Sequence, residues 1–208
     1  MKVLIEKDAE DFLEKNKFPI AKRVVIKKEG EIESAIKKLK FPVSMKIIGK
    51  NILHKTDVGG VKLDIRTLDE AQKSFKALKK IRGFEGVLVQ KFIPGKYVLI
   101  GLKKTAEFGH VIVFGLGGVF TEVISDVSFR VCPIKDKDAL EMIDEIKGKQ
   151  ILYGLRGGKR VSIKSIKNIL LKISKLSEKY PKIKELDINP AIVSEKDAKI
   201  VDARIIFE

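Results

Sequence analysis

The spacing of apolar residues changes near Gly86, and this change constrains the possible folds more than any other feature of the sequence. Before Gly86, apolar residues at helical spacing, as in Ile32–Leu39, alternate with short strand-like runs. After it, strand-like runs with only short Gly- or Pro-containing breaks follow at Val87–Phe92, Tyr97–Leu102 and His110–Phe114. The first part therefore predicts alternating helices and strands, and the second part predicts a sheet-rich region.

The complete pattern predicts an α+β chain in two lobes. Helices are predicted near residues 8–16, 32–39, 67–81, 139–146 and 166–176, and further strands at 23–26, 43–48, 61–65, 183–188, 191–194 and 200–206. We expect residues 1–90, which include a short leading helix, to form the N-terminal lobe and residues 91–208 to form the C-terminal lobe. The hinge is predicted near residues 90–95, with a binding cleft between the lobes.

The composition is that of a folded globular protein without a membrane span. Of the 208 residues, 44% are hydrophobic and 34% are charged. No apolar run approaches the ~18 residues that a membrane-spanning helix needs. Met1–Lys7 reaches acidic residues too early to contain the apolar region of a signal peptide, and the single Cys132 excludes an internal disulfide. We therefore expect a cytoplasmic protein with no membrane partner.

The formal net charge of +15 predicts attraction to polyanions, which include nucleic acids, anionic membranes and phosphorylated metabolites. Most lysines, however, lie on the outer faces of predicted helices, as in Ile36–Lys40 and Lys76–Lys80. They are not interleaved with aromatic residues on which bases could stack. A solvated helix surface is therefore favoured over a nucleic-acid interface.

Lys46 lies in the middle of the predicted strand Val43–Ile48, which is mostly apolar. Strand alternation separates Lys46 from the face formed by Val43, Met45 and Ile47. An ammonium group on such a strand is costly unless it meets a counter-charge or water, so we expect Lys46 to face a cleft where a phosphate could neutralise it. A lysine whose charged end reaches solvent from an edge strand would give the same pattern.

The predicted loop Ile52–Lys62 places His54 and Lys55 before the glycine pair Gly59-Gly60. Glycines let the backbone approach a phosphate closely, and backbone N–H groups together with Lys55 would supply positive potential. The imidazole of His54, partly neutral near pH 7, could act as a nucleophile toward phosphorus. A loop histidine that is merely exposed remains the alternative.

A glycine-rich turn follows the predicted strand that ends at Phe114, with Gly115, Gly117 and Gly118 before Glu122. The glycines lack the spacing of a dinucleotide-binding motif, and no helix is predicted immediately after them, so the pattern excludes a Rossmann interpretation. A nucleotide contact and a tight structural turn both remain possible.

Asp187 and Asn189 alternate along a predicted strand and therefore lie on one face. Asp202 joins that face, within roughly 5–8 Å of Asn189, if the intervening hairpin loop contains an even number of residues. Carboxylate and amide oxygens suit Mg²⁺, which takes one or two protein ligands together with phosphates and water. An exposed polar sheet face is the alternative, and Pro190 requires an edge or a bulge because it lacks a ladder donor.

Taken together, these segments resemble the β subunit of ADP-forming acetyl-CoA synthetases, within the ATP-grasp superfamily that also contains succinyl-CoA synthetase β chains. The resemblance is ordered and nearly full-length, and seven motifs in one order are more specific than any one of them. The matching segments are Phe41–Val43 with Lys46, His54–Lys62, Val87–Gln90, Phe114–Gly118, Asp126–Val131 with Pro133, Arg156-Gly157, and Glu185–Pro190.

The resemblance implies an ATP-grasp fold with a nucleotide cleft between its lobes. It further implies that Lys46 contacts the nucleotide phosphates and that Asn189 and Asp202 hold Mg²⁺. The adenine would be held at the hinge by the backbone of Gln90, Lys91, Phe92 and Ile93. The chain departs from the family where Lys91 and Tyr97 each replace a common glutamate, the latter near the expected ribose site, which concerns nucleotide affinity and not the fold.

The resemblance also implies a reaction and a partner. A histidine matching His54 relays a phosphoryl group between an α-subunit phosphohistidine and ADP, and Asp187 matches an acid needed near it. The implied reaction converts acyl-CoA, ADP and phosphate into a carboxylic acid, ATP and CoA. The chain lacks the CoA-binding and ligase domains, so a separate α subunit that binds CoA and a small carboxylic acid is expected, in a hetero-oligomer.

Three other functions compete with this one. An ATP-grasp ligase that joins a carboxylate to an amine without a phosphohistidine would tolerate the loss of His54. A basic nucleic-acid-binding module would show a steep loss of binding with salt and no need for ADP or Mg²⁺. A non-catalytic ATP-grasp subunit would keep the fold without turnover. The last two leave the ordered motifs unexplained.

Overall fold

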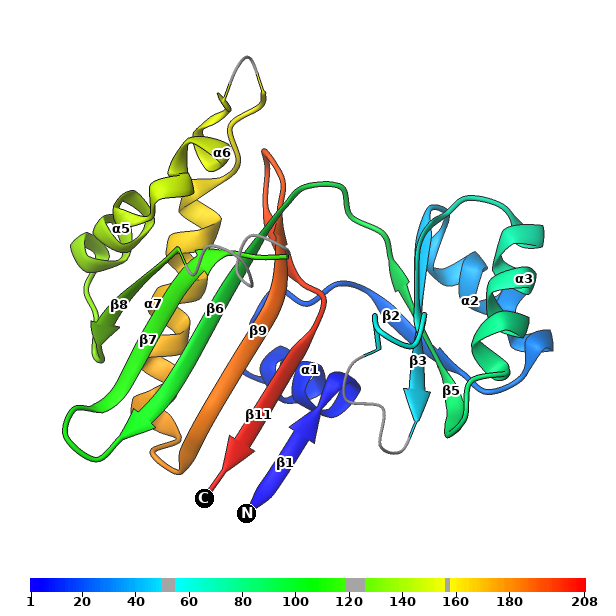
Figure 1. Cartoon of the computed structure of the whole chain (residues 1–208), viewed down its shortest axis with the longest axis horizontal. Helices are drawn as coiled ribbons and strands as arrows, with labels where there is room; N and C mark the ends of the chain where they lie inside the picture. Colours follow the sequence, from blue (N-terminus) through cyan, green and yellow to red (C-terminus); the bar gives the residue numbers. More distant parts are fainter. Residues whose placement is uncertain (50–54, 119–125, 156–157) are drawn as a thin grey trace. The chain divides into compact units, whose positions relative to one another are not determined.

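The computed structural model describes residues 1–49, 55–118, 126–155 and 158–208. Within these residues the chain forms two compact units (Figure 1). The larger unit combines Met1–Ile20 with Ile93–Glu208, and the smaller unit is Ala21–Phe92. The chain thus leaves the larger unit after its first twenty residues and returns to it at Ile93.

Within its described residues, the smaller unit is a four-stranded antiparallel sheet with two helices packed on one face. Its elements are β2 (Arg23–Ile26), the short 3-10 helix η1 (Glu29–Glu31), α2 (Ile32–Leu39), β3 (Val43–Gly49), β4 (Val61–Ile65), α3 (Leu68–Lys79) and β5 (Phe84–Lys91). The strand order is β2-β5-β3-β4, so β3 is an interior strand. The helices and strands predicted for this part of the chain are confirmed to within a few residues.

Strand alternation builds the helix-covered face of the smaller sheet. Val43, Met45 and Ile47 on β3 are fully buried and belong to one apolar cluster with Phe75 and Leu78 of α3. Burial of side chains of this size contributes about 1.5–3 kcal/mol each. The opposite face of β3 is left for the remaining residues of the strand.

The larger unit is built on a second antiparallel sheet, seven-stranded in the described residues, in the order β1-β11-β9-β6-β7-β8 with β10 paired to β9. Its strands are β1 (Lys2–Ile5), β6 (Lys96–Thr105), β7 (Gly109–Leu116), β8 (Val127–Val131), β9 (Ile183–Val193), β10 (Ala198–Ile200) and β11 (Ala203–Phe207). Its helices are α1 (Glu6–Lys15), α5 (Asp136–Glu145), the short η2 (Lys147–Lys149), α6 (Gln150–Tyr153) and α7 (Ile163–Lys179).

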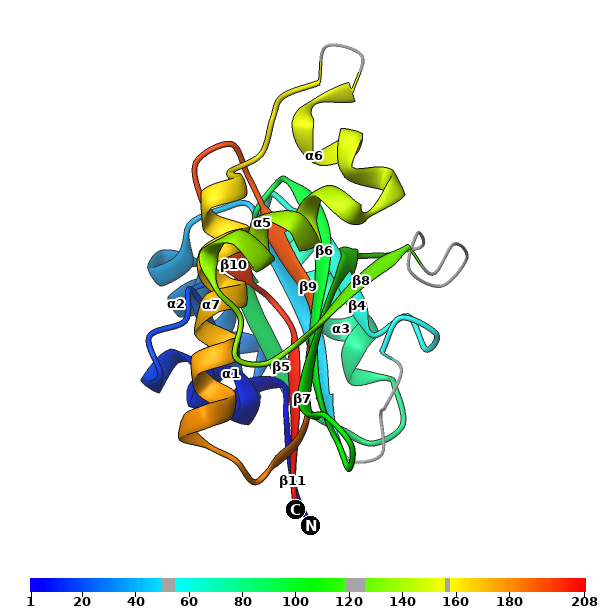
Figure 2. The ribbon, with the colours of Figure 1, turned by 90° about the vertical axis from the view of Figure 1, so that its left-hand side faces the viewer.

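Helices cover one face of the larger sheet. Figure 2 views this sheet nearly edge-on and shows α1 and α7 on the same side of it. Ile166 and Ile173 of α7 are buried in one apolar cluster with Leu186 and Ile188 of β9. Because side chains alternate along a strand, Asp187 must point away from this core, to the opposite face of the sheet.

The N-terminal segment differs from the expected domain division. Residues 1–20 were expected in the N-terminal lobe, but β1 pairs with β11 in the larger sheet, with Leu4 opposite Ile205. Ala9 and Leu13 of α1 are fully buried in the core of that unit. The sequence pattern did not reveal this, because a four-residue strand gives no sign of a partner at the other end of the chain.

The C-terminal strands also differ in detail from the prediction. Residues 183–188 and 191–194 were predicted as separate strands, but β9 runs without a break from Ile183 to Val193. Pro190 lies within β9, where Val201 N–H donates to its carbonyl at 3.2 Å. The edge strand β8 was not predicted at all.

Among the described helices, none combines the length and apolar character that a membrane crossing needs.

Gly95 lies where the chain enters β6, and we expect any side chain at this position to lower the stability of the fold. A Cβ placed on Gly95 would lie 2.5 Å from the Val193 carbonyl oxygen and 2.8 Å from Ile192 Cγ2. Because a backbone atom blocks this space, Gly95→Ala should lower the free energy of unfolding by about 1–3 kcal/mol in urea denaturation. A Cβ on Gly30 would have no neighbour within 4 Å, so Gly30→Ala is the matched control. Equal midpoints for the two variants would contradict the expectation.

Candidate functional site

Lys46 lies on the face of the smaller sheet that the helices do not cover. It alternates with the buried Met45 and Ile47 and is only 7% exposed. Because β3 is an interior strand, paired on both sides, the alternative of a lysine reaching solvent from an edge strand is wrong. The same face holds the buried Ser44 and Gln90, which are paired in register on β3 and β5. The contact of Lys46 with a phosphate remains a prediction.

Gln90 offers an unused hydrogen-bond donor on this face. Its side chain is 1% exposed, and its Nε2 has no hydrogen-bond partner among the described residues. The main-chain carbonyl of Gln90 accepts a hydrogen bond from Ser44 Oγ at 3.4 Å. Buried polar groups in folded proteins nearly always have partners, so an unsatisfied amide beside Lys46 is the kind of group that a bound polar ligand satisfies.

Two backbone N–H groups after Gln90 already donate hydrogen bonds within the smaller unit. Lys91 N–H donates to Lys22 O at 2.8 Å, and Phe92 N–H donates to Pro42 O at 3.1 Å. Two of the N–H groups in the segment expected to hold adenine are therefore already used. The expectation that this backbone holds adenine therefore rests on the carbonyl groups of the segment and on the N–H of Ile93.

The side chain of Lys91 binds protein atoms. Its Nζ donates to the carbonyl oxygens of Lys40 at 3.0 Å and Phe41 at 2.9 Å. These carbonyls follow the C-terminal end of α2, where the helix dipole favours positive charge. Lys91 was predicted as a nucleotide-binding residue, and in the structure its ammonium group is held within the smaller unit.

The glycine turn before β4 is closed by its own hydrogen bonds. Gly60 N–H donates to Lys55 O at 2.7 Å, and Gly59 N–H donates to Thr56 O at 3.0 Å. A phosphate contact from either N–H group would therefore require the turn to open. His54, the predicted phosphoryl carrier, lies outside the described residues, as do Arg156 and Gly157.

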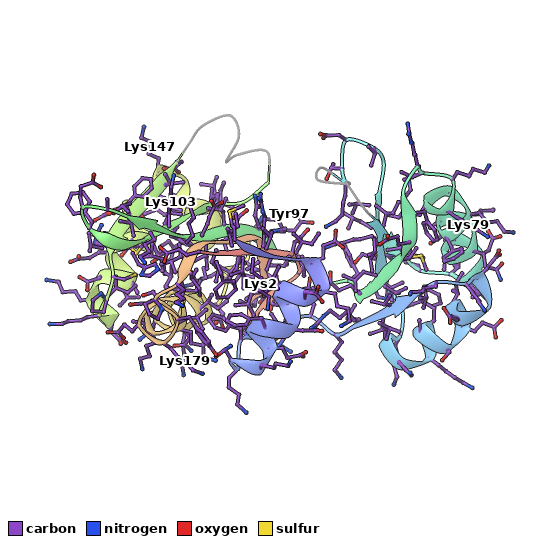
Figure 3. The ribbon with its side chains drawn as sticks, turned by 90° about the horizontal axis from the view of Figure 1, so that it is seen from below. Lys2, Lys79, Tyr97, Lys103, Lys147 and Lys179 are labelled. Carbon is purple, nitrogen blue, oxygen red and sulfur yellow. The ribbon has the colours of Figure 1, made fainter. Side chains whose placement is uncertain are left out.

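The second glycine turn packs directly on Tyr97, which Figure 3 labels at the start of β6. Gly117 N–H donates to Tyr97 O at 2.8 Å. A Cβ on Gly117 would lie 3.2 Å from Tyr97 Cβ, and Gly118 has a φ of +74°. The turn therefore has a structural reason for both glycines. Its continuation, including Glu122, lies outside the described residues.

Asp187, Asn189 and Asp202 come together as the alternation predicted. Four residues, Ser194–Asp197, separate the paired Val193 and Ala198, so the hairpin loop has the even length that the prediction required. The register of β11 on β9 continues to Asp202, whose carbonyl accepts a hydrogen bond from Asn189 N–H at 3.3 Å. Sequence reasoning missed Arg204, which lies directly opposite Asp187 on β11.

Asp187 is the most perturbed acid of this group. The pKa of Asp187 is raised from 3.8 to about 6, chiefly by burial and then by the nearby carboxylates of Glu185 and Asp202, while the guanidinium of Arg204 opposes them. Repelling carboxylates on one sheet face are also what a bound cation would stabilise. A perturbed acid at a convergence of polar groups is typical of functional sites.

The donor set fits Mg²⁺ better than a transition metal. Asn189 on β9 and Asp202, in the neighbouring segment between β10 and β11, carry side-chain oxygen atoms. The residues that the structure describes hold no cluster of three or more His, Cys, Asp or Glu suited to a metal ion. Two oxygen donors match a cation that takes most of its remaining ligands from phosphates and water.

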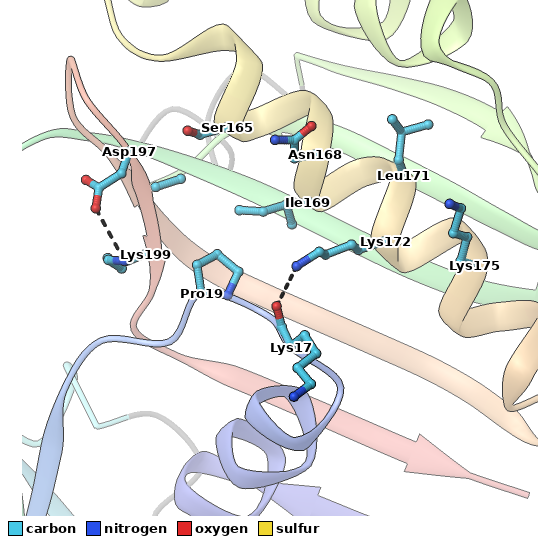
Figure 4. A pocket seen from close by; sticks show the side chains of 11 residues that line it. Lys17, Pro19, Ser165, Asn168, Ile169, Leu171, Lys172, Lys175, Asp197 and Lys199 are labelled. Atoms are coloured by element: carbon cyan, nitrogen blue, oxygen red, sulfur yellow. Dashed lines mark hydrogen bonds and ion pairs between the residues drawn. The ribbon is translucent and has the colours of Figure 1, made fainter.

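A separate cavity of about 400 Å³ lies on the helix-covered side of the larger sheet (Figure 4). It is lined by α7, the segment after α1 and the β10 hairpin, and four lysines and one aspartate contribute to it. Lys172 Nζ donates to Lys17 O, and Lys199 pairs with Asp197 at 3.3 Å. Because Asp187 faces the opposite side of the sheet, we do not assign the nucleotide to this cavity.

A model of the ATP-grasp domain family matches residues 1–207. The β subunit of ADP-forming acetate–CoA ligase I of Pyrococcus furiosus is 40% identical over 212 residues, which cover 98% of this chain and 91% of that protein. ADP-forming acetate–CoA ligase II of Archaeoglobus fulgidus is 40% identical over 205 residues, and there the chain spans only 30% of the longer protein.

The fold is shared with solved structures. The dinucleotide-forming acetyl-coenzyme A synthetase 1 of Candidatus Korarchaeum cryptofilum, in complex with coenzyme A and Ca-AMPCP, superimposes with a TM-score of 0.93 and 38% identity. The match covers 100% of this chain and 94% of that one. A second structure of that enzyme contains Mg-AMPPCP and has its phosphohistidine segment pointing towards the nucleotide binding site, with a TM-score of 0.87.

Proposed function

Because this chain belongs to the ATP-grasp family, and within it to the β subunits of ADP-forming acetate–CoA ligases, we propose that it is the nucleotide-binding subunit of an ADP-forming acyl-CoA synthetase. The reaction is acyl-CoA + ADP + phosphate ⇌ carboxylic acid + ATP + CoA. The observation that carries the proposal is the 40% identity, over nearly the whole chain, to a separate β subunit. The buried Lys46 on an interior strand supports it.

The proposal gives each polar group of the site a task. Lys46 neutralises phosphate charge, Gln90 Nε2 donates to a nucleotide acceptor, and the segment from Gln90 to Ile93 holds the adenine through its backbone. Asn189 and Asp202 hold Mg²⁺, which supplies charge neutralisation on the phosphates when it is bound. Phosphoryl transfer depends mainly on such positioning and on charge neutralisation.

His54 is proposed to relay the phosphoryl group between a phosphohistidine of the α subunit and ADP. The imidazole attacks phosphorus and forms an N–P bond while the bond to the donor histidine breaks, and ADP oxygen then takes the group and releases the imidazole. Asp187 is proposed to act near His54. Its pKa of about 6 leaves it largely ionised near neutral pH, where it can orient an imidazole and stabilise its protonated form.

The α subunit is proposed to contribute CoA binding and carboxylic acid activation. Longer relatives such as that of Archaeoglobus fulgidus hold the matching segment together with more than twice its length of further sequence. A relative of similar length to this chain is a separate β subunit. With a single cysteine and no internal disulfide, the protein suits a reducing compartment, and we place it in the cytoplasm.

Reconstitution tests this function. The chain alone is expected to bind ADP in the presence of Mg²⁺ but to form no ATP from acetyl-CoA, ADP and phosphate. Addition of the α subunit should produce ATP, and removal of Mg²⁺ with EDTA should abolish it. Salt-sensitive binding to nucleic acid without ADP binding would contradict the proposal, and so would ATP-dependent joining of a carboxylate to an amine by the chain alone.

A further inference from the structure

Lys91 forms hydrogen bonds that tie the end of β5 to the turn between α2 and β3. Its Nζ donates to Lys40 O at 3.0 Å and to Phe41 O at 2.9 Å. The next residue along the chain, Phe92, donates its N–H to Pro42 O at 3.1 Å. Three successive carbonyl groups, those of residues 40–42, are therefore all bound by residues 91 and 92.

The other side of this segment is held as well. Lys91 N–H donates to Lys22 O at 2.8 Å, and Lys91 pairs in register with Val43 on β3. Helix α2 ends at Leu39, and Lys40, with a φ of 60°, turns the chain toward β3. The charged amine thus lies at the negative end of the helix and ties the end of β5 to the turn that precedes β3.

We propose that Lys91 is a positioning residue for the nucleotide: its ammonium group fixes the backbone from Gln90 to Ile93 by binding the carbonyls of Lys40 and Phe41. This inference rests on the proposed function, since it assumes that this backbone holds the adenine. The amine is bound by protein carbonyls, so it neither contacts the nucleotide nor leaves an unpaired charge beside it.

The test compares ADP binding by Lys91→Met with that of the native chain. Methionine keeps the apolar stem but cannot donate, so the two carbonyls lose their partner and the segment loosens. We expect the dissociation constant for ADP, and the KM for ADP in the reconstituted enzyme, to rise about tenfold, because small displacements of a binding segment weaken its contacts to this extent. The kcat should change by less than about twofold, since no reacting group is altered.

Two further variants separate positioning from a general loss of charge or stability. Lys91→Arg keeps donors for both carbonyls and should restore ADP affinity to within about threefold of the native value. Lys79→Met removes an exposed lysine of the same unit, labelled in Figure 3, and should leave ADP binding unchanged. If Lys91→Met does not fold, Lys91→Gln, which is too short to reach both carbonyls, gives the same comparison.

Hydrogen exchange at Phe92 provides a readout that does not depend on activity. Protection of its N–H, which is bound to Pro42 O, should fall in Lys91→Met and stay unchanged in Lys79→Met. Native-like ADP affinity in Lys91→Met would overturn the inference while leaving the proposed function intact. Failure of the native chain itself to bind ADP would overturn the proposed function, and this inference with it.

Discussion

The His54→Ala variant is expected to accept no phosphate from labelled ATP, whereas the native chain becomes labelled when Mg²⁺ and the α subunit are present. Alanine has no nucleophile, so transfer should fall on the order of a thousandfold or more. The label on the native chain should be acid-labile and base-stable, as expected for phosphate on a histidine nitrogen. Rapid quenching followed by separation of the chains measures it.

The second histidine of the chain provides a matched control, because the sequence contains only two. His110 is half-buried on β7, and its Nε2 lies 2.7 Å from the carbonyl oxygen of Ile183, which explains the residue structurally. His110→Ala should therefore keep the label. If nucleotide binds but neither label nor turnover depends on His54, the relay is lost, and the ligase without a phosphohistidine or the non-catalytic subunit becomes the better explanation.

Asp187→Asn is expected to stabilise the protein at pH 8 and to impair phosphoryl transfer. The pKa of Asp187 is raised from 3.8 to about 6 in the folded chain, so the folded state binds more protons than the unfolded state between these values. The contribution of Asp187 to the free energy of unfolding is fully present below about pH 4, where the carboxyl is neutral, and is lost as pH rises through about 6. Asparagine cannot ionise, so the variant should gain up to about 2–3 kcal/mol in free energy of unfolding at pH 8 and nothing near pH 4.

The same variant should lower phosphoryl transfer by about a hundredfold, since it removes the acid proposed to act on His54. Glu185→Gln is the control, because Glu185 lies two residues away on the same strand and this substitution removes one negative charge in the same way. It should retain transfer. Urea denaturation at several pH values measures the stability, and labelled ATP measures the transfer. A destabilised Asp187→Asn at pH 8 would contradict the raised pKa, and full transfer would contradict the proposed role.

The site illustrates how far alternation along a strand can be used. Lys46 was assigned correctly to the face opposite Met45 and Ile47, because neighbouring side chains on a strand must point to opposite sides. The joint position of Asn189 and Asp202 depended on loop parity, and the observed loop Ser194–Asp197 satisfies that condition. Backbone hydrogen bonds were not predictable in this way. The internal bonds of Gly59 and Gly60, and the carbonyl partners of Lys91, depend on atoms that meet only after folding.

The sequence by itself determined most of the helices and strands, the α+β class, the ordered motifs and the faces on which Lys46 and Asp187 lie. Each of these depends on local spacing, which is legible in a single segment. Only the tertiary structure decided that β1 pairs with β11, that the first twenty residues join the larger unit, and that Lys91 binds the turn after α2. These are contacts between residues about fifty to two hundred positions apart, and their geometry follows from how whole elements pack against one another.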